Sequence, residues 1–261
     1  MTSDLDRTID TLAHWIAESR HLVAFTGAGI STDSGIPDFR GPDGVWTRRD
    51  AGLPPPRWKT PQSKVAPNAA HLALVTLQEM GILRFLISQN TDNLHLRAGM
   101  RQDMIAELHG NGALMRCLGC DARYTRHEVG WDRAEWGPGY RTDRPVRGQP
   151  ACPKCHGRLI SSVVNFGDPL PEKDLRTAAA HAAACDVMLV LGSSLVVNPA
   201  AALVGVAIEA GAKVALVNRG ETPYDDVVQL RTHAGIGEVL VPAVERVPSL
   251  VGRRKRPRAS A

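Results

Sequence analysis

The chain has 261 residues, a hydrophobic share of 43% and a formal net charge of +4. This length suits one substantial hydrophobic core, or one core with a small appended module. The charge is too small to make nucleic-acid binding the expected main function, and no apolar run reaches the ~18 residues of a membrane-spanning helix. The N-terminus Met1–Asp6 lacks the apolar core of a signal peptide. We therefore expect a cytoplasmic protein, nuclear if the source is eukaryotic, with no membrane partner.

Helices and strands alternate along most of the chain. Apolar residues recur every three or four positions over residues 5–16, which predicts an amphipathic first helix. Further helices are expected after the capping residue Asn68, over 172–184, and from Asn198 to Gly211. Short apolar runs predict buried strands over 22–25, 83–88, 104–108, 160–164, 186–191, 213–218 and 238–241. This alternation predicts an α/β fold with one doubly wound, Rossmann-like parallel sheet.

The segment 26–40 directly follows the first strand and carries the first functional signal. A strand that runs into closely spaced glycines can bring backbone N–H groups to a phosphate, and Gly27 and Gly29 have no Cβ to hold a ligand away. The fingerprint of dinucleotide oxidoreductases fails, because Thr32 stands where its third glycine belongs and no acidic ribose-binding residue follows at the usual distance. A nucleotide ligand is therefore expected, and hydride transfer is not.

An acid, an aromatic ring and a guanidinium follow the glycines as Asp38, Phe39 and Arg40. The ring can cover a sugar, and the guanidinium offers a fixed fork of donors to phosphate or carboxylate. The whole run, G-A-G-I-S-x-x-S-G-I-P-D-F-R, resembles the cofactor-binding loop of the sirtuins, the NAD-dependent protein deacylases. The irregular, Pro-rich stretch after it is a candidate lid.

Two C-x-x-C pairs interrupt the α/β pattern, and each pair can form a tight knuckle that presents two thiolates to one tetrahedral ion. Four thiolates fill the zinc shell, so we expect one structural, non-catalytic Zn²⁺. The alternative, haem attachment at a C-x-x-C-H motif, would require export and would leave the first pair unexplained. The predicted ligands are Cys117, Cys120, Cys152 and Cys155.

The change of composition around the cysteines also suggests domain boundaries. We expect a zinc-binding module over 112–157, inserted into an NAD-binding domain made of 1–111 and 158–247. Residues 248–261 are expected to form a basic, disordered tail. Its arginines and lysine leave nucleic acid as a secondary candidate partner.

Polar residues follow two of the predicted strands. Gln89, Asn90 and Asp92 come at the end of the second strand, where an α/β sheet binds its ligands, and can read a carboxamide and a ribose. A capped polar turn is the structural alternative. His109 ends the third strand, and an imidazole that titrates near neutrality suits proton removal from a ribose hydroxyl. A purely structural histidine is the alternative there.

The resemblance to the sirtuins extends through these segments and implies roles for them. The Q-N-x-D and L-H-G-N motifs of that family imply that His109 is the general base and that Asn90 and Asp92 are catalytic. The substrate peptide is implied to lie as an added strand against Val164, Phe166, Gly167 and Val196. The implied cofactor contacts are Gly27, Ala28, Gly29, Thr32, Asp38, Phe39, Arg40, Trp46, Gln89, Asn90, Asp92, His109, Gly192, Ser193, Ser194, Asn218, Gly220 and Ile236.

The resemblance runs from about Val23 to Val241 and looks closest to the class IV branch. It implies an enzyme that uses NAD as co-substrate, removes the acyl group from acylated-lysine proteins, transfers it to ADP-ribose and releases nicotinamide. The segment Arg57–Lys64 lacks the Tyr-x-x-Arg pair of the desuccinylating branch, which favours a small or fatty acyl group. The alternatives are a mono-ADP-ribosyltransferase on the same scaffold and, more distantly, a zinc-ribbon nucleic-acid-binding protein.

Overall fold

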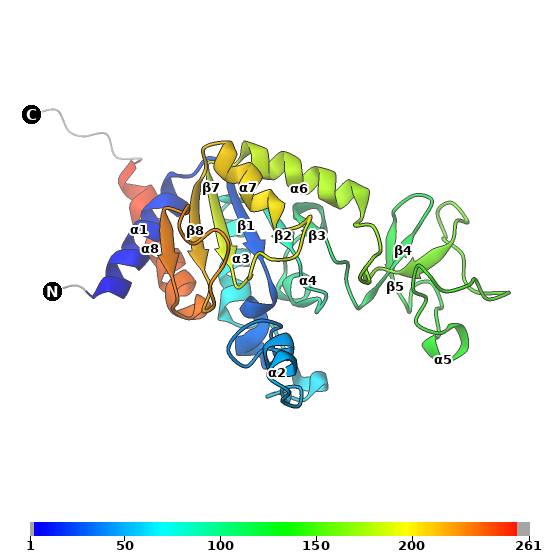
Figure 1. Cartoon of the computed structure of the whole chain (residues 1–261). Coiled ribbons are helices and arrows are strands. Elements are labelled where there is room, and N and C mark those ends of the chain that lie inside the picture. Colours follow the sequence, from blue (N-terminus) through cyan, green and yellow to red (C-terminus); the bar gives the residue numbers. More distant parts are fainter. Residues whose placement is uncertain (1–2, 255–261) are drawn as a thin grey trace, which may run out of the picture. The chain divides into compact units, whose positions relative to one another are not determined.

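The computed structural model describes residues 3–254, which fold into two compact units (Figure 1). The sheet unit contains the described residues up to Ser88, then Leu94–Ala106, then the described residues from Arg176 onward. The cysteine unit contains Gln89–Asn93 and Glu107–Leu175. Among residues 3–254, no helix combines the length and the apolar character needed to cross a membrane.

The elements follow the predicted alternation closely. The helices are α1 (Asp4–Glu18), α2 (Val45–Asp50), α3 (Ala69–Glu79), α4 (Leu94–Ala98), α5 (Arg133–Trp136), α6 (Glu172–Ala184), α7 (Ala202–Glu209) and α8 (Ile236–Arg254). Short 3-10 helices are η1 (Ala28–Ser34), η2 (Gln62–Lys64) and η3 (Gln102–Met104). The strands are β1 (Leu22–Thr26), β2 (Leu83–Ser88), β3 (Ile105–Glu107), β4 (Leu114–Cys117), β5 (Arg123–Thr125), β6 (Leu159–Ser161), β7 (Val187–Leu191), β8 (Lys213–Val217) and β9 (Leu230–Thr232).

The large sheet has the strand order β3-β2-β1-β7-β8-β9. β1 pairs in parallel with β2 and with β7, and β7, β8 and β9 continue in parallel. The chain therefore builds the sheet outward from β1 in one direction and then from β7 in the other. The neighbouring carboxyl ends of β1 and β7 form the topological switch point at which doubly wound sheets bind ligands. The predicted fold class is confirmed.

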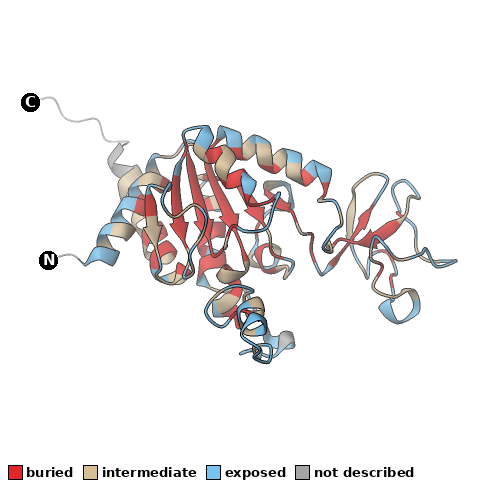
Figure 2. Cartoon of the chain, in the orientation of Figure 1, coloured by how far each residue is buried: buried red, intermediate tan, exposed pale blue. Residues whose placement is uncertain are grey.

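Helices cover both faces of this sheet. On one face α1 packs along α8, and α8 also contacts α3. On the other face α7 contacts β7 and β8, and His181 of α6 stacks on Phe85 of β2 with ring centroids 4.0 Å apart. Every residue of β1 and β7 is buried, and the central strands are red in Figure 2. The core of the sheet unit therefore lies in two apolar layers around one sheet.

The cysteine unit has a smaller, antiparallel sheet of order β5-β4-β6. Its core is formed by few large side chains, among them Met115, Trp131 and Leu159. The position of β6 in this sheet is a correction, because the strand expected over 160–164 was assigned to the main parallel sheet. A three-residue apolar strand carries no local signal for its partner, and the pairing with β4 decides where β6 lies.

The last predicted strand, over 238–241, is wrong, because these residues belong to α8. Val239, Leu240, Ala243 and Val247 are fully buried, at the spacing of one helical face. α8 continues to Arg254, past the expected start of a disordered tail at 248, and Leu250 is among the residues that pack against the core. Residues 255–261 of that tail lie outside the described part of the chain.

Three smaller differences complete the comparison with the sequence. β9 was not predicted, and it extends the sheet beyond β8. α7 begins at Ala202 rather than at Asn198. The candidate lid contains a short helix, α2, although its glycines and prolines suggested an irregular segment.

Candidate active site

The glycines after β1 are required by a close approach between two loops of the sheet unit. A Cβ on Gly27 would lie 2.6 Å from the carbonyl oxygen of Gly192, and a Cβ on Gly29 would lie 2.7 Å from its Cα. Gly192 follows β7 and has a φ of 69°, which favours glycine. The two loops at the switch point therefore pack backbone to backbone, where side chains would not fit.

Two backbone amides that were expected to face a phosphate form hydrogen bonds within this packing instead. The N–H of Gly27 donates to the carbonyl of Leu191 at 3.0 Å, and that of Gly29 donates to the carbonyl of Gly192 at 2.8 Å. Thr32 donates its hydroxyl to the carbonyl of Gly29 at 2.9 Å. The structural reason for these glycines is thus loop packing; their contact with NAD, and that of Ala28, stays a prediction.

A helix cap holds the same loop from the other side. Asn68 caps α3 by accepting from the N–H of Ala70 at 3.0 Å, while its amide donates to the carbonyl of Ile30 at 2.8 Å and to Ser34 Oγ at 3.1 Å. The capping residue found in the sequence therefore also fixes η1.

The segment from Asp38 to Trp46 is folded back on itself. Asp38 accepts from the N–H of Gly41 at 3.0 Å, and burial raises the pKa of its carboxyl, opposed by that hydrogen bond and by Arg219. Phe39, which is 50% exposed, stacks on Trp46 with ring centroids 5.9 Å apart. Trp46 is half-buried, and the guanidinium carbon of Arg49 lies 4.3 Å from the centroid of its ring. Phe39 is therefore the exposed ring that can cover a sugar or nicotinamide ring. Arg40, the next residue, is also exposed.

The loop between β8 and β9 is organised by Arg231, which the sequence analysis did not assign to the site. Its guanidinium donates to the carbonyls of Asn218 at 2.7 Å and Gly220 at 2.6 Å, and it pairs with Asp225 at 2.9 Å. Asn218 also donates its amide to the carbonyl of Gly220 at 2.8 Å. Two of the predicted cofactor residues are thus held in one rigid turn.

The remaining residues predicted in the sheet unit lie in the loop after β7 and at the start of α8. Ser193 is buried and accepts from the N–H of Leu195 at 3.2 Å, which closes a tight turn in which Ser194 is half-buried. Val196, a predicted substrate contact, is 46% exposed. Ile236 is buried as the first residue of α8.

In the cysteine unit, the predicted general base is oriented by a backbone carbonyl. His109 Nδ1 lies 2.9 Å from the carbonyl oxygen of Gln89, so Nδ1 carries the proton and donates it there. Nε2 is then the nitrogen that can accept a proton. Burial lowers the pKa of this imidazole, opposed by the hydrogen bond to Gln89, so the neutral, basic form predominates at pH 7.

The loop Gln89–Asn93 is fastened to the chain that follows His109. The N–H of Gly112 donates to the carbonyl of Thr91 at 2.8 Å. Asn90 is buried and Asp92 is half-buried, while Asn93 has a φ of 66°, an uncommon value for a residue other than glycine. The predicted catalytic residues of this unit are thus brought together with His109.

The predicted peptide-binding segment begins beside the same histidine. The N–H of Val164 donates to the carbonyl of His109 at 3.0 Å, and Gly167 follows in a turn with a φ of 88°. Phe166 is 87% exposed, an unusual exposure for a large aromatic side chain. Phe166 thus presents an exposed apolar side chain within the segment that is predicted to pair with an extended peptide.

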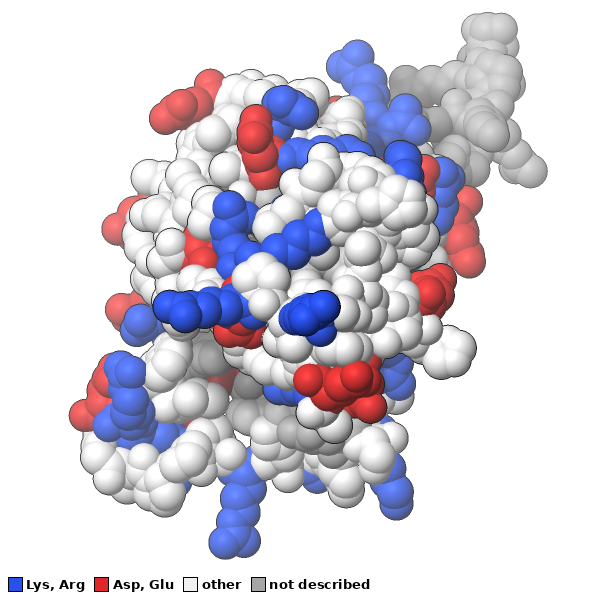
Figure 3. All heavy atoms as spheres, turned by 90° about the vertical axis from the view of Figure 1, so that its right-hand side faces the viewer, with Lys and Arg blue, Asp and Glu red and all other residues white. Residues whose placement is uncertain are grey.

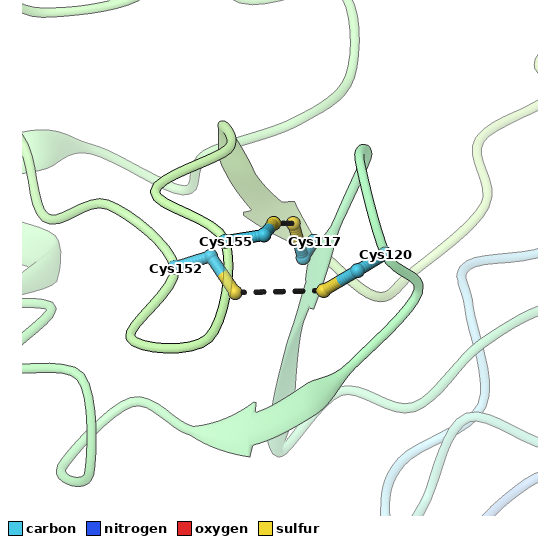
Figure 4. Close-up of side chains that lie close together, drawn as sticks. All are labelled: Cys117, Cys120, Cys152 and Cys155. Atoms are coloured by element: carbon cyan, nitrogen blue, oxygen red, sulfur yellow. Dashed lines mark hydrogen bonds between the residues drawn. The ribbon is translucent and has the colours of Figure 1, made fainter.

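The four predicted metal ligands converge on one point (Figure 4). Their sulfur atoms all lie within 4.8 Å of one another, with 3.4 Å between Cys117 and Cys155 and 3.7 Å between Cys120 and Cys152. Zn–S bonds of about 2.3 Å in a tetrahedron require sulfur atoms about 3.8 Å apart. A Cβ on Gly157 would lie 3.1 Å from the sulfur of Cys117, so this glycine leaves room for the cluster. The residues fit one structural zinc ion.

The sequence model of the Sir2 family matches residues 27–53 and 56–199, more than half of the chain. The chain belongs to the Sir2 family. The resemblance to the sirtuins is thereby confirmed, while the position of this Sir2 protein in the class IV branch stays a prediction.

Named relatives and a solved structure agree with this assignment. The chain is 38% identical to the NAD-dependent protein deacetylase SRT1 of Arabidopsis thaliana over 91% of this chain, which is 48% of that protein. It is 39% identical to the NAD-dependent protein deacylase 2 of Archaeoglobus fulgidus, over 94% of this chain and 98% of that protein. A structure of Sir2 with a peptide and NAD+ shares 36% identity and a TM-score of 0.66, over 94% of this chain and 99% of that one. The chain thus spans about half of the plant relative and nearly all of the archaeal one.

Proposed function

We propose that this Sir2 protein is an NAD-dependent protein-lysine deacylase. The observation that carries the proposal is His109, a neutral histidine whose Nδ1 proton is held by the Gln89 carbonyl and whose Nε2 is the basic nitrogen. Family membership supports the same activity, because the relatives that the chain covers almost completely are named NAD-dependent deacylases or deacetylases. Acylated-lysine proteins or peptides are the proposed substrates.

The residues divide the work of binding NAD. In the sheet unit, the loops after β1, β7 and β8 would hold the phosphates and the adenosine end, and Phe39 with Trp46 would cover the site and exclude water. In the cysteine unit, Gln89, Asn90 and Asp92 would hold the nicotinamide and its ribose. NAD supplies an electrophilic ribose carbon whose leaving group is nicotinamide.

Acid–base chemistry falls to His109 Nε2. This nitrogen takes the proton of a ribose hydroxyl, so that the hydroxyl oxygen can bond to the acyl carbon. The Gln89 carbonyl keeps the Nδ1 proton in place and stabilises the imidazolium that results. The bond between the ribose carbon and nicotinamide and the bond between the acyl carbon and the lysine nitrogen both break, and one water molecule is consumed. Acyl-lysine, NAD and water thus give the free lysine amine, nicotinamide and acyl-ADP-ribose. One zinc ion, bound by the four cysteines, has a structural role, since four thiolates complete its coordination.

The test is incubation of the zinc-loaded protein with NAD and a panel of acetyl-, longer fatty acyl- and succinyl-lysine peptides. Mass spectrometry should show loss of the acyl group from the peptide in step with release of nicotinamide. A gain of ADP-ribose mass on the acceptor would identify a mono-ADP-ribosyltransferase instead. Absence of nicotinamide release with every peptide would contradict the proposal.

Nucleic acid is not part of the proposed main function. Figure 3 shows Lys and Arg side chains mixed with Asp and Glu on the face that it presents, rather than an unbroken basic surface. The exposed Arg133, Arg144 and Arg147 of the cysteine unit have exposed Asp132 and Glu135 in the same stretch of chain. The basic residues 255–258 lie outside the described part of the chain, so a role for them in binding nucleic acid stays a prediction.

A further inference from the structure

A cluster of buried charged and amide side chains lies in the cysteine unit next to the catalytic loop. Asn111 Nδ2 donates to Glu107 Oε1 at 2.6 Å and to Asn93 Oδ1 at 2.9 Å. Arg123 pairs with Glu107 at 3.3 Å and also forms a close ion pair with Asp174. The Arg123 side chain is 9% exposed and that of Glu107 is 3% exposed, so these charges are largely removed from water.

The cluster joins segments that are far apart in the sequence. Glu107 ends β3, Arg123 begins β5 in the cysteine-rich sheet, and Asp174 lies in the first turn of α6. Burying charges is costly, and an apolar cluster of similar volume is often at least as stable. Stability alone therefore does not explain the arrangement. The cluster ends in a hydrogen bond to Asn93, which indicates that it holds the loop to which Asn93 belongs.

The end of the cluster lies inside the predicted nicotinamide-binding loop. Asn93, which directly follows Asp92, has its left-handed backbone conformation, and the Asn111 amide holds its side chain there. The loop is also tied through the carbonyls of Thr91 and Gln89 to the chain that follows β3. The Asn111 bond differs from those two because it continues through Glu107 to the Arg123 cation.

Charge balance makes Arg123 the decisive member. Burial raises the pKa of Glu107 to about 7, while the Asn111 hydrogen bond and Arg123 lower it and Asp174 and Asp92 raise it. Burial also raises the pKa of Asp174, opposed by Arg123 and Arg116. Without the Arg123 cation, the carboxyl groups of Glu107 and Asp174 would stay buried with no shared counter-charge, and an unpaired Glu107 carboxylate would disturb the acceptor of the Asn111 hydrogen bond.

We propose that Arg123 is a positioning residue for the deacylation reaction, acting through Glu107 and Asn111 to hold the loop Gln89–Asn93 in its catalytic conformation. The cysteine-rich sheet thereby contributes to the nicotinamide end of the site through an ion pair as well as through its fold. This inference rests on the proposed function, since it assigns the loop to NAD. It concerns a residue that does not itself contact the substrates.

The test compares Arg123→Met with Arg133→Met, an exposed arginine of α5 in the same unit. Nicotinamide release with a saturating acyl-peptide gives kcat and the KM for NAD, and calorimetry gives the Kd of ADP-ribose, which lacks the nicotinamide. Zinc content is measured for each protein. Arg123→Lys, which keeps one cation without the bridging fork, serves as a milder variant if Arg123→Met does not fold.

For Arg123→Met we expect kcat/KM for NAD to fall by roughly 10- to 100-fold, as for a small misplacement of reacting groups, with the Kd of ADP-ribose within about twofold of wild type. Arg133→Met should behave as wild type. Removing both charges in Arg123→Met with Glu107→Gln should restore part of the loss, because no unpaired Glu107 charge remains. Arg123→Lys should fall between wild type and Arg123→Met.

Three results would overturn the proposal. The first is unchanged NAD kinetics in both Arg123→Met and Arg123→Lys. The second is a loss of zinc or of ADP-ribose affinity that matches the loss of turnover, which would mean a general folding defect. The third is a wild-type protein that binds ADP-ribose but releases no nicotinamide, which would refute the proposed function and this inference with it.

Discussion

The two units hold the loops that carry the predicted site residues by different physical means. In the sheet unit, the loops after β1 and β7 are held by glycine backbones in contact and by main-chain hydrogen bonds, over a core of fully buried strands. In the cysteine unit, the loop Gln89–Asn93 is held by side-chain hydrogen bonds, from His109 to the Gln89 carbonyl and from Asn111 to Asn93. Buried ion pairs of Arg123 lie behind the second of these bonds. A large sheet can position its loops by packing alone, whereas a small unit requires polar and metal bonds.

The comparison also separates the expected effects of mutations. Changes in the cysteine unit should act through the zinc site, the histidine and the charges, and should affect chemistry strongly. Changes at the switch point should act through sterics and affect stability.

Removal of zinc should be the most damaging change. Structural zinc sites contribute on the order of 10 kcal/mol or more to folding, far more than the few apolar side chains of this unit can replace. Cys155→Ser, or treatment of the wild type with a strong chelator, should abolish deacylation, because His109 and the loop Gln89–Asn93 belong to the same unit. Proteolysis should then cut within 107–175 before it cuts elsewhere.

The matched control is Cys185→Ala, which removes a buried thiol that lies in the sheet unit outside the cluster. It should keep a full zinc content, measured by elemental analysis, and most of the activity. A chelated or Cys155→Ser protein with wild-type turnover would show that the cluster does not support the site.

Replacing the general base comes next. His109→Ala should reduce deacylation by about 10²- to 10⁴-fold, the usual contribution of an acid–base group, and leave the thermal midpoint nearly unchanged. His127→Ala, an exposed histidine of the same unit, is the control and should keep full activity. If His109→Ala retains turnover near that of the control, the assignment of the base is wrong.

The switch point should respond mainly in stability. In Gly29→Ala the new Cβ would lie 2.7 Å from Gly192 Cα, so one loop must move. Overpacking of this kind typically costs 1–3 kcal/mol, which corresponds to a fall of roughly 2–12 °C in the thermal midpoint of a chain of this size. Gly237→Ala in α8 is the control, since its Cβ would lie 3.6 Å from the nearest atom, and alanine favours a helix. Equal midpoints for the two variants would contradict the steric account.

Much of the fold was predictable because its signals are local. The apolar run of β1, the cap at Asn68 and the two C-x-x-C pairs each fit within a few residues. The error at 238–241 was avoidable, because Ile236, Val239, Leu240, Ala243 and Val247 already have helical spacing in the sequence. The strand prediction rested on only four residues, 238–241, and the prolines at 242 and 248 argued against a helix.

The parts that were missed depend on partners far along the chain. β6 resembles any apolar strand, and only its pairing with β4 shows that it leaves the main sheet. In the sequence, Arg231 and Arg123 look like ordinary surface charges, and Glu107 is a single acidic residue in the predicted strand 104–108. Their roles appear only when carbonyls and carboxylates distant in the chain come within bonding distance. The sequence pointed to Gly27 and Gly29 as site residues, but it did not predict the close contact with Gly192 that requires glycine at both positions.

The smallest effect is a pH dependence, and it distinguishes two titrating groups of the cysteine unit. Burial lowers the pKa of His109, so the basic form persists below the ordinary histidine value of about 6.5. The acid limb of kcat/KM should therefore lie below that value. Neutral His109 is favoured in the folded state, so its contribution to stability is full above pH ~6.5 and is lost as the pH falls through the lower folded pKa.

Glu107 would act in the opposite direction, because burial raises its pKa to about 7. Its protonated form is favoured in the folded state, so its contribution to stability is lost as the pH rises through about 7. A pH profile of wild type and Glu107→Gln separates the two groups. An acid limb below about 6.5 that persists in Glu107→Gln assigns the limb to His109. If the acid limb of kcat/KM instead lies near pH 7 and disappears in Glu107→Gln, the limb belongs to the Glu107 carboxyl group. The His109 imidazole would then not control the rate in this range.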